Sequence, residues 1–174
     1  MHYSPFALCL RTLAAMRCLL MGQLPSYMAA PHPQNQFGES TGMLVGGNMS
    51  VFCGLAGSDY DFLNRVDEGL ILFIEDTGEA NYSVDRMLLS LQQSGKLQNV
   101  KGIIVGEFSG GSQGSDLPLN EIIRKYVGEL GIPVVYGVQS GHDTVNIPIM
   151  LGREATITVD GTTAKIEFDK TFAK

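Results

Sequence analysis

The sequence has little positive charge, few cysteines and no tryptophan. Its 12 Lys and Arg residues are outnumbered by 18 Asp and Glu residues, which gives a formal net charge of -6. A chain of this kind lacks the basic stripe that neutralises phosphates, so we expect no nucleic-acid partner. The three cysteines, Cys9, Cys18 and Cys53, show no CxxC spacing, which speaks against a disulfide framework or a zinc knuckle. A reducing compartment, the cytoplasm, is the expected location.

The sequence also lacks an apolar run that approaches the roughly 18 residues needed to span a bilayer. Residues 6–30 are apolar and contain no acid, as a targeting signal does, but Arg11 and Arg17 interrupt them. Residues 5–21 carry leucine and methionine at helical spacing, and Gly22 ends the pattern. We therefore favour an amphipathic helix that packs on another part of the protein, and no membrane association.

The pattern of elements predicts an α/β fold. Residues 26–41 are rich in proline and glycine and are expected to be a linker. Short apolar runs then alternate with helical patterns: runs at 43–45, 70–74, 102–105 and 132–135, helices at 84–93 and 117–130. Such alternation is typical of an α/β core with mainly parallel strands and flanking helices. The end of the chain differs, because residues 155–159 and 164–168 alternate apolar with polar around Asp160-Gly161 and predict a β-hairpin.

Acidic side chains follow the most hydrophobic of these runs. Residues 70–74 lead directly into Glu75 and Asp76, and Glu79 comes shortly after. The end of a strand is where α/β folds place functional groups, and a carboxylate there could orient an imidazole or bind a metal. Alternatively, Asp76 or Glu79 could cap the helix expected to begin near Ser83. The residues alone leave these alternatives open.

One histidine lies in the part of the chain with the α/β pattern. His142 follows Gly141, and a glycine there would permit the close backbone approach that exposes an imidazole to a ligand. The other two histidines, His2 and His32, lie in the amino-terminal extension. A lone histidine is more often structural than catalytic, and one histidine with scattered acids does not make a metal site. We therefore expect neither a metal nor another cofactor.

A nucleophilic serine is harder to find. The pattern GxSxG is absent, because Ser109 and Ser140 each lie one place late relative to the glycines around them. The Gly/Ser segment 109–115 has no lysine after its glycines, so it does not resemble a phosphate-binding loop. We expect that segment to be a mobile surface loop.

Several of these motifs occur together in one known family. The stretches 42–48, 69–76 with Glu79, and 82–86 resemble the serine LD-carboxypeptidases, also called muramoyltetrapeptide carboxypeptidases. The likeness continues through residues 101–108, Gly141-His142 and 148–152, in the same order and spacing, and covers roughly residues 40–160. The resemblance implies a compact swivelling-type β/β/α domain over residues 42–174, with residues 1–25 as the end of a preceding amino-terminal domain.

The same resemblance assigns roles to two residues. Glu75, at the family's Leu-Glu-Asp position, and His142 would be the second and third members of a Ser-Glu-His triad. The family's serine lies in a Gly-x-Ser-Asp type motif of the amino-terminal domain, which this sequence does not contain. The resemblance implies release of terminal D-alanine from murein tetrapeptides during cell-wall recycling. We expect this chain to be inactive alone and to form a homodimer.

The sequence leaves two alternative functions open. The chain could be a non-catalytic, truncated binding or dimerisation module, which would explain the absent serine motif. It could also resemble a relative that cleaves peptide-nucleotide antibiotics, since such enzymes share the glutamate and the histidine.

Overall fold

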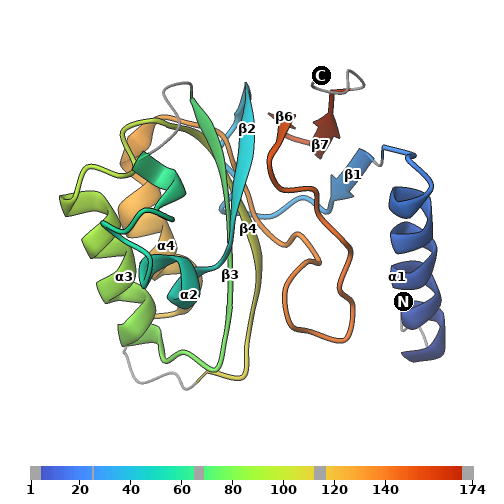
Figure 1. The fold of residues 1–174 in the computed structure, drawn as a ribbon, viewed down its shortest axis with the longest axis horizontal. Helices are drawn as coiled ribbons and strands as arrows, with labels where there is room; N and C mark the ends of the chain where they lie inside the picture. Colours follow the sequence, from blue (N-terminus) through green and yellow to red (C-terminus); the bar gives the residue numbers. More distant parts are fainter. Residues whose placement is uncertain (1–4, 25, 65–68, 112–116, 170–174) are drawn as a thin grey trace.

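The structure is a computed structural model that describes residues 5–24, 26–64, 69–111 and 117–169 of the 174-residue chain. The strands are β1 (Ser26–Ala29), β2 (Gly38–Asn48), β3 (Leu70–Thr77), β4 (Val100–Ser109), β5 (Val134–Val135), β6 (Arg153–Val159) and β7 (Ala164–Phe168). The helices are α1 (Pro5–Leu20), α2 (Met49–Cys53), α3 (Asn81–Gln93) and α4 (Leu119–Val127), with 3-10 turns η1 (Phe62–Asn64) and η2 (Gly128–Leu130). Figure 1 shows their arrangement.

The strands form one seven-stranded sheet in the order β1-β7-β6-β2-β3-β4-β5. Strands β2 to β5 are parallel, whereas β6, β7 and β1 continue the sheet by antiparallel pairing. The predicted α/β core and the terminal hairpin β6–β7 are thereby confirmed. The hairpin turn is stabilised by the Asp160 carboxylate, which accepts hydrogen bonds from the backbone amides of Thr162 and Thr163.

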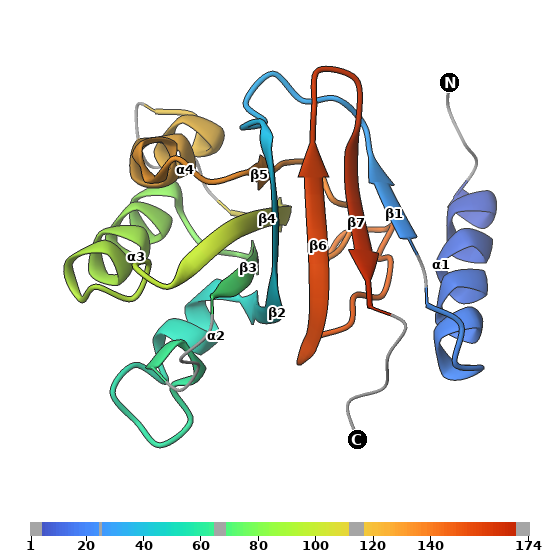
Figure 2. The ribbon, with the colours of Figure 1, turned by 90° about the horizontal axis from the view of Figure 1, so that it is seen from above.

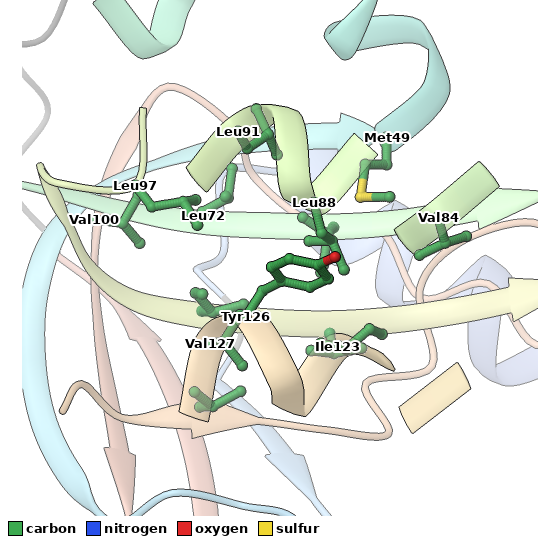
Figure 3. Packing of buried hydrophobic residues seen from close by; sticks show 14 of the residues in the cluster. Met49, Leu72, Val84, Leu88, Leu91, Leu97, Val100, Ile123, Tyr126 and Val127 are labelled. Atoms are coloured by element: carbon green, nitrogen blue, oxygen red, sulfur yellow. The ribbon is translucent and has the colours of Figure 1, made fainter. Parts of the chain in front are cut away.

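Two hydrophobic cores lie on opposite faces of the parallel strands. Helices α2, α3 and α4 cover one face (Figure 2), and the cluster there includes Ile74 together with Leu72 and Leu88, which Figure 3 labels. The other face packs against β6, β7 and part of the segment between β5 and β6, in a cluster that includes Ile71 and Phe73. Because successive side chains of a strand point to opposite faces, β3 supplies its odd-numbered residues to one core and its even-numbered residues to the other.

The segment expected to be a linker contributes to the sheet. Residues 26–29 form β1, which pairs with β7, and the first residues of β2 also fall within 26–41. Burial holds β1 in place, since the Tyr27 ring packs edge-on against Phe168 with ring centroids 5.8 Å apart. Residues 26–29 are therefore strand, because pairing with the distant hairpin outweighs the local signal of proline and glycine, and the division of the chain into domains stays a prediction.

Helix α1 is present where the sequence predicts it and lies beyond β1 (Figures 1 and 2). Its apolar side chains are not covered as expected for a packed amphipathic helix: Leu13 is 58% exposed and Leu20 is 80% exposed. No helix among the described residues is long and apolar enough to cross a membrane. Most of the Gly/Ser segment predicted to be a mobile loop, residues 112–116, lies outside the described residues.

Candidate active site

Glu75 and Asp76 leave β3 on opposite faces of the sheet. Glu75 continues the series Ile71 and Phe73, which faces the core shared with β6 and β7. Asp76 continues the series of even-numbered residues, which faces the helices. Both side chains are buried, with exposed fractions of 5% and 1%. The period of the strand therefore gives these two neighbouring carboxylates different partners.

Asp76 fastens α2 to the end of β3. Its carboxylate accepts hydrogen bonds from Asn48 Nδ2 at 2.9 Å, from the Ser50 amide at 2.8 Å and from the Thr77 amide at 2.8 Å. The Ser50 hydroxyl adds a fourth bond at 3.2 Å. The expectation that Asp76 or Glu79 caps the next helix is wrong, because α3 begins at Asn81 without a side-chain cap. Asp76 satisfies the orphan amide at the start of α2 instead.

Glu75 reaches the histidine predicted to accompany it. Its Oε2 atom lies 2.8 Å from Nδ1 of His142, although the two residues are 67 positions apart in the sequence. A carboxylate oxygen only accepts, so Nδ1–H donates and Nε2 is the nitrogen left for other chemistry. The carboxylate is buried, whereas the imidazole side chain is 50% exposed. The pair thus has a fixed inner end and an accessible outer end.

Gly141 allows the histidine to approach the glutamate this closely. Its φ of +150° is one that L side chains rarely adopt, and a Cβ there would lie 3.1 Å from Glu75 Oε2 and 3.1 Å from Cβ of Glu107. The loop is held by a bond from the Gly141 amide to Asn146 Oδ1 at 3.2 Å and from the Ile147 amide to the Gln139 carbonyl at 2.7 Å. The space available at residue 141 therefore requires glycine.

Neither of the two serines considered as a nucleophile, Ser109 or Ser140, is hydrogen-bonded to His142. Ser140 is buried, and its carbonyl oxygen accepts a hydrogen bond from the Glu107 amide at 2.9 Å. The Ser109 hydroxyl lies 3.3 Å from the hydroxyl of Thr77. Within the described ranges, no serine hydroxyl is hydrogen-bonded to His142. The structure thus brings together an acceptor and an imidazole, without a nucleophile beside them in this part of the chain.

The other histidines lie apart from this pair. His32 stacks on Tyr136 with ring centroids 5.1 Å apart, and its Nδ1 accepts a hydrogen bond from the Gln34 amide. His2 lies outside the described residues. A search of the described residues for three or more clustered His, Cys, Asp and Glu side chains that could hold a metal finds none.

Sequence reasoning missed Glu107, which lies on the same face as the Glu75–His142 pair. It is half-buried near the end of β4. The sequence signal that could have identified it is an acid that follows a buried apolar run. Burial raises the pKa of its carboxyl above the ordinary value, and the negative charge of Asp143 raises it further. Asn146, which holds the histidine loop through Gly141, was also missed.

Comparison with known proteins identifies the family. Residues 41–157 match the family described as LD-carboxypeptidase C-terminal domain. The chain belongs to the LD-carboxypeptidase family. The predicted resemblance over roughly residues 40–160 is thereby confirmed.

Several relatives carry the same likeness. The chain is 34% identical over 133 residues to a probable murein peptide carboxypeptidase of Bacillus subtilis, covering 75% of this chain and 41% of the relative. It is 28% identical over 158 residues to the murein tetrapeptide carboxypeptidase of Pseudomonas aeruginosa, covering 85% and 48%. The chain thus spans about half the length of the curated relatives that it matches.

Solved structures show the same fold. The crystal structure of muramoyltetrapeptide carboxypeptidase from Oxalobacter formigenes superposes with a TM-score of 0.79 at 28% identity, covering 90% of this chain and 54% of that one. The microcin self immunity protein MccF superposes with a TM-score of 0.67 at 24% identity, covering 84% and 42%. The second likeness is a likeness of fold alone.

Proposed function

We propose that this chain supplies the general base and its orienting carboxylate to a serine-type LD-carboxypeptidase that releases terminal D-alanine from murein tetrapeptides. The observation that carries the proposal is the 2.8 Å contact between buried Glu75 and the exposed ring of His142. A carboxylate and the imidazole that it orients are two of the three members of a hydrolytic triad. The nucleophilic serine, in this proposal, lies outside these 174 residues.

In the proposed reaction, the free Nε2 of His142 takes the proton of the serine hydroxyl. At the same time the serine oxygen attacks the scissile carbonyl carbon. The carbon–nitrogen bond then breaks, and the same Nε2 gives its proton to the amine of the departing D-alanine. His142 Nε2 then takes a proton from a water molecule whose oxygen attacks the acyl carbon, the bond from that carbon to the serine oxygen breaks, and Nε2 returns the proton to the serine oxygen. Glu75 holds the ring with Nδ1 protonated and stabilises its charged form throughout.

Two protein preparations test the proposal. The first is this chain alone, and the second is this chain joined to the amino-terminal half of the Oxalobacter formigenes relative. Both are given a murein tetrapeptide, and D-alanine release is measured. We expect no appreciable release by the chain alone, release by the joined protein, and its loss in His142→Ala. His32→Ala, which removes the other described histidine, is the matched control and should retain the activity.

Other outcomes would point elsewhere. Release by the chain alone, abolished by His142→Ala, would show that a nucleophile lies within it. A joined protein that folds but releases nothing would favour the non-catalytic binding or dimerisation module. The likeness to the microcin self immunity protein carries the fold alone, so cleavage of peptide-nucleotide antibiotics has no separate support. The homodimer, the cytoplasmic location and the absence of a cofactor stay predictions.

A further inference from the structure

A bulge in β4 turns Glu107 toward the Glu75–His142 pair. Ile74 pairs with Val105, and Asp76 pairs with Phe108, so two residues of β4 lie opposite the single residue Glu75. In a regular strand Gly106 and Glu107 would face opposite sides of the sheet. The extra residue instead leaves both beside the histidine loop, where a Cβ on Gly106 would meet the Ser140 carbonyl. Bulges re-aim side chains in this way and are frequent next to active sites.

Gly141 connects Glu107 to the candidate active site. A Cβ at Gly141 would be 3.1 Å from both Glu75 Oε2 and Cβ of Glu107, so this one residue separates the two acids. The Glu107 amide also donates to the carbonyl of Ser140, the residue before Gly141. Glu107 is therefore fixed against the loop that carries His142.

A cavity of about 730 Å³ opens beside Glu107. Its walls come from α1, β1 and the segment after β5, and they include Ala14, Met28, Val138 and Ile149. Of the described residues that line it, Glu107 alone carries a charge. A mostly apolar cavity with a few polar groups, one of them charged and at a fixed place, is typical of a ligand site that orients a chain with a charged end.

The Glu107 carboxylate has no cation to balance it. Among the described residues, no hydrogen bond or ion pair reaches it, and the charge that acts on it is the like charge of Asp143. Partial burial of an unpaired carboxylate is unfavourable, so a cation supplied by a ligand would relieve that cost. An ammonium group on a flexible aliphatic chain combines the charge that Glu107 lacks with the surface that the cavity walls offer.

We propose that Glu107 is a specificity-determining residue that pairs with a side-chain ammonium group carried by the residue on the acyl side of the scissile bond. The aliphatic part of that side chain then lies against the apolar walls of the cavity. This inference rests on the function proposed above. It assigns Glu107 to recognition of substrate, whereas His142 acts on the reacting atoms and Glu75 orients His142.

The test compares two substrates that differ in the ammonium group. They are the tetrapeptide with L-lysine as its third residue and the same peptide with norleucine there, which keeps the four-carbon chain. The joined protein described above is assayed on both as wild type, Glu107→Gln and Glu129→Gln. The last is a matched control at an exposed glutamate of η2.

We expect the wild-type kcat/KM to favour the lysine peptide by about tenfold or more, because a site with an unpaired buried group discriminates against a ligand that cannot pair with it. Glu107→Gln should bring the ratio close to one, and Glu129→Gln should leave it unchanged. A ratio near one in the wild type, or a ratio unaffected by Glu107→Gln, would overturn the assignment.

A binding measurement separates this inference from the proposed function. The isolated chain is titrated with each peptide while the backbone amide signals of Gly141 and Gln139 are followed by NMR. Hydrolysis of neither peptide by the folded joined protein would refute the proposed function. In that case, shifts caused by the lysine peptide and lost in Glu107→Gln still support Glu107 as an ammonium site, and the absence of such shifts refutes it.

Discussion

Glu75 and Asp76 are consecutive in β3, yet the first is bonded to His142 and the second to the start of α2. The strand's alternation sends one carboxylate to each face of the sheet. Asp76 therefore fixes the end of the strand from the helix side, and Glu75 uses that fixed end to hold the imidazole on the other side. A structural acid and a proposed catalytic acid are thus neighbours in one strand.

Replacing Asp76 with Ala should destabilise the fold. The substitution removes an acceptor of four part-buried hydrogen bonds and takes this partner from donors on Asn48, Ser50 and Thr77. We expect the free energy of unfolding to fall by about 2–4 kcal/mol. Urea denaturation of the chain measures the loss. Asp59→Ala, at an exposed acid, is the control, and an equal effect at both positions would contradict the role of Asp76.

Gly141→Ala should separate His142 from Glu75. The new methyl group would crowd Glu75 Oε2 and Glu107 in a backbone conformation unsuited to alanine. We expect a loss of about 1–3 kcal/mol in the free energy of unfolding, together with changed NMR signals of the His142 ring. Gly161→Ala is the matched control, because a Cβ there meets open space. Unchanged ring signals in Gly141→Ala would contradict the requirement for glycine at this position.

The hairpin turn should make stability depend on pH through Asp160. Hydrogen bonds from the amides and hydroxyls of Thr162 and Thr163 lower its pKa to about 2. The unfolded chain binds this proton near pH 4, so the stabilising effect is present above that pH and is lost as the pH falls toward 2. The difference in Tm between wild type and Asp160→Asn should shrink across that window. A constant difference would show that the carboxylate does not carry the effect.

Glu107→Gln should raise the stability of the chain at neutral pH. Because the pKa of Glu107 is raised in the folded state, the unfolded chain loses this proton first, and stability falls as the pH rises through the folded pKa. The amide cannot ionise and avoids that loss. Thermal unfolding should show a higher Tm for the variant at pH 7 and no difference below about pH 4. A lower Tm at pH 7 would mean that Glu107 is stabilised by a partner.

Much of the fold follows from local patterns in the sequence. The apolar run at 70–74, the helical spacing at 84–93 and the turn at Asp160-Gly161 each specify an element that the structure contains. Strand β1 was missed because four residues next to prolines carry little local signal, and the pairing with β7 is what makes them a strand.

The candidate site could be predicted only in part from the sequence. Residue patterns alone left Glu75, Asp76 and Glu79 equivalent, and the family resemblance selected Glu75. Alternation along β3 separates Glu75 from Asp76 only when the face that carries His142 is known. That face depends on the irregular path of residues 136–151, which has no periodicity to read. The bulge that turns Glu107 depends on the register of two strands far apart in sequence, so it was not predictable.

The role of Glu75 as the residue that orients the base can be measured from the tautomer of His142 in the isolated chain. Long-range proton–nitrogen NMR, recorded at a pH where the ring is neutral, reports which nitrogen carries the proton. We expect Nδ1 to be protonated and hydrogen-bonded and Nε2 to be free. Glu75→Ala should remove this preference, whereas Asp59→Ala should not. A ring protonated at Nε2 in the wild type, or one indifferent to Glu75→Ala, would contradict the assignment of Glu75 as the residue that orients the base.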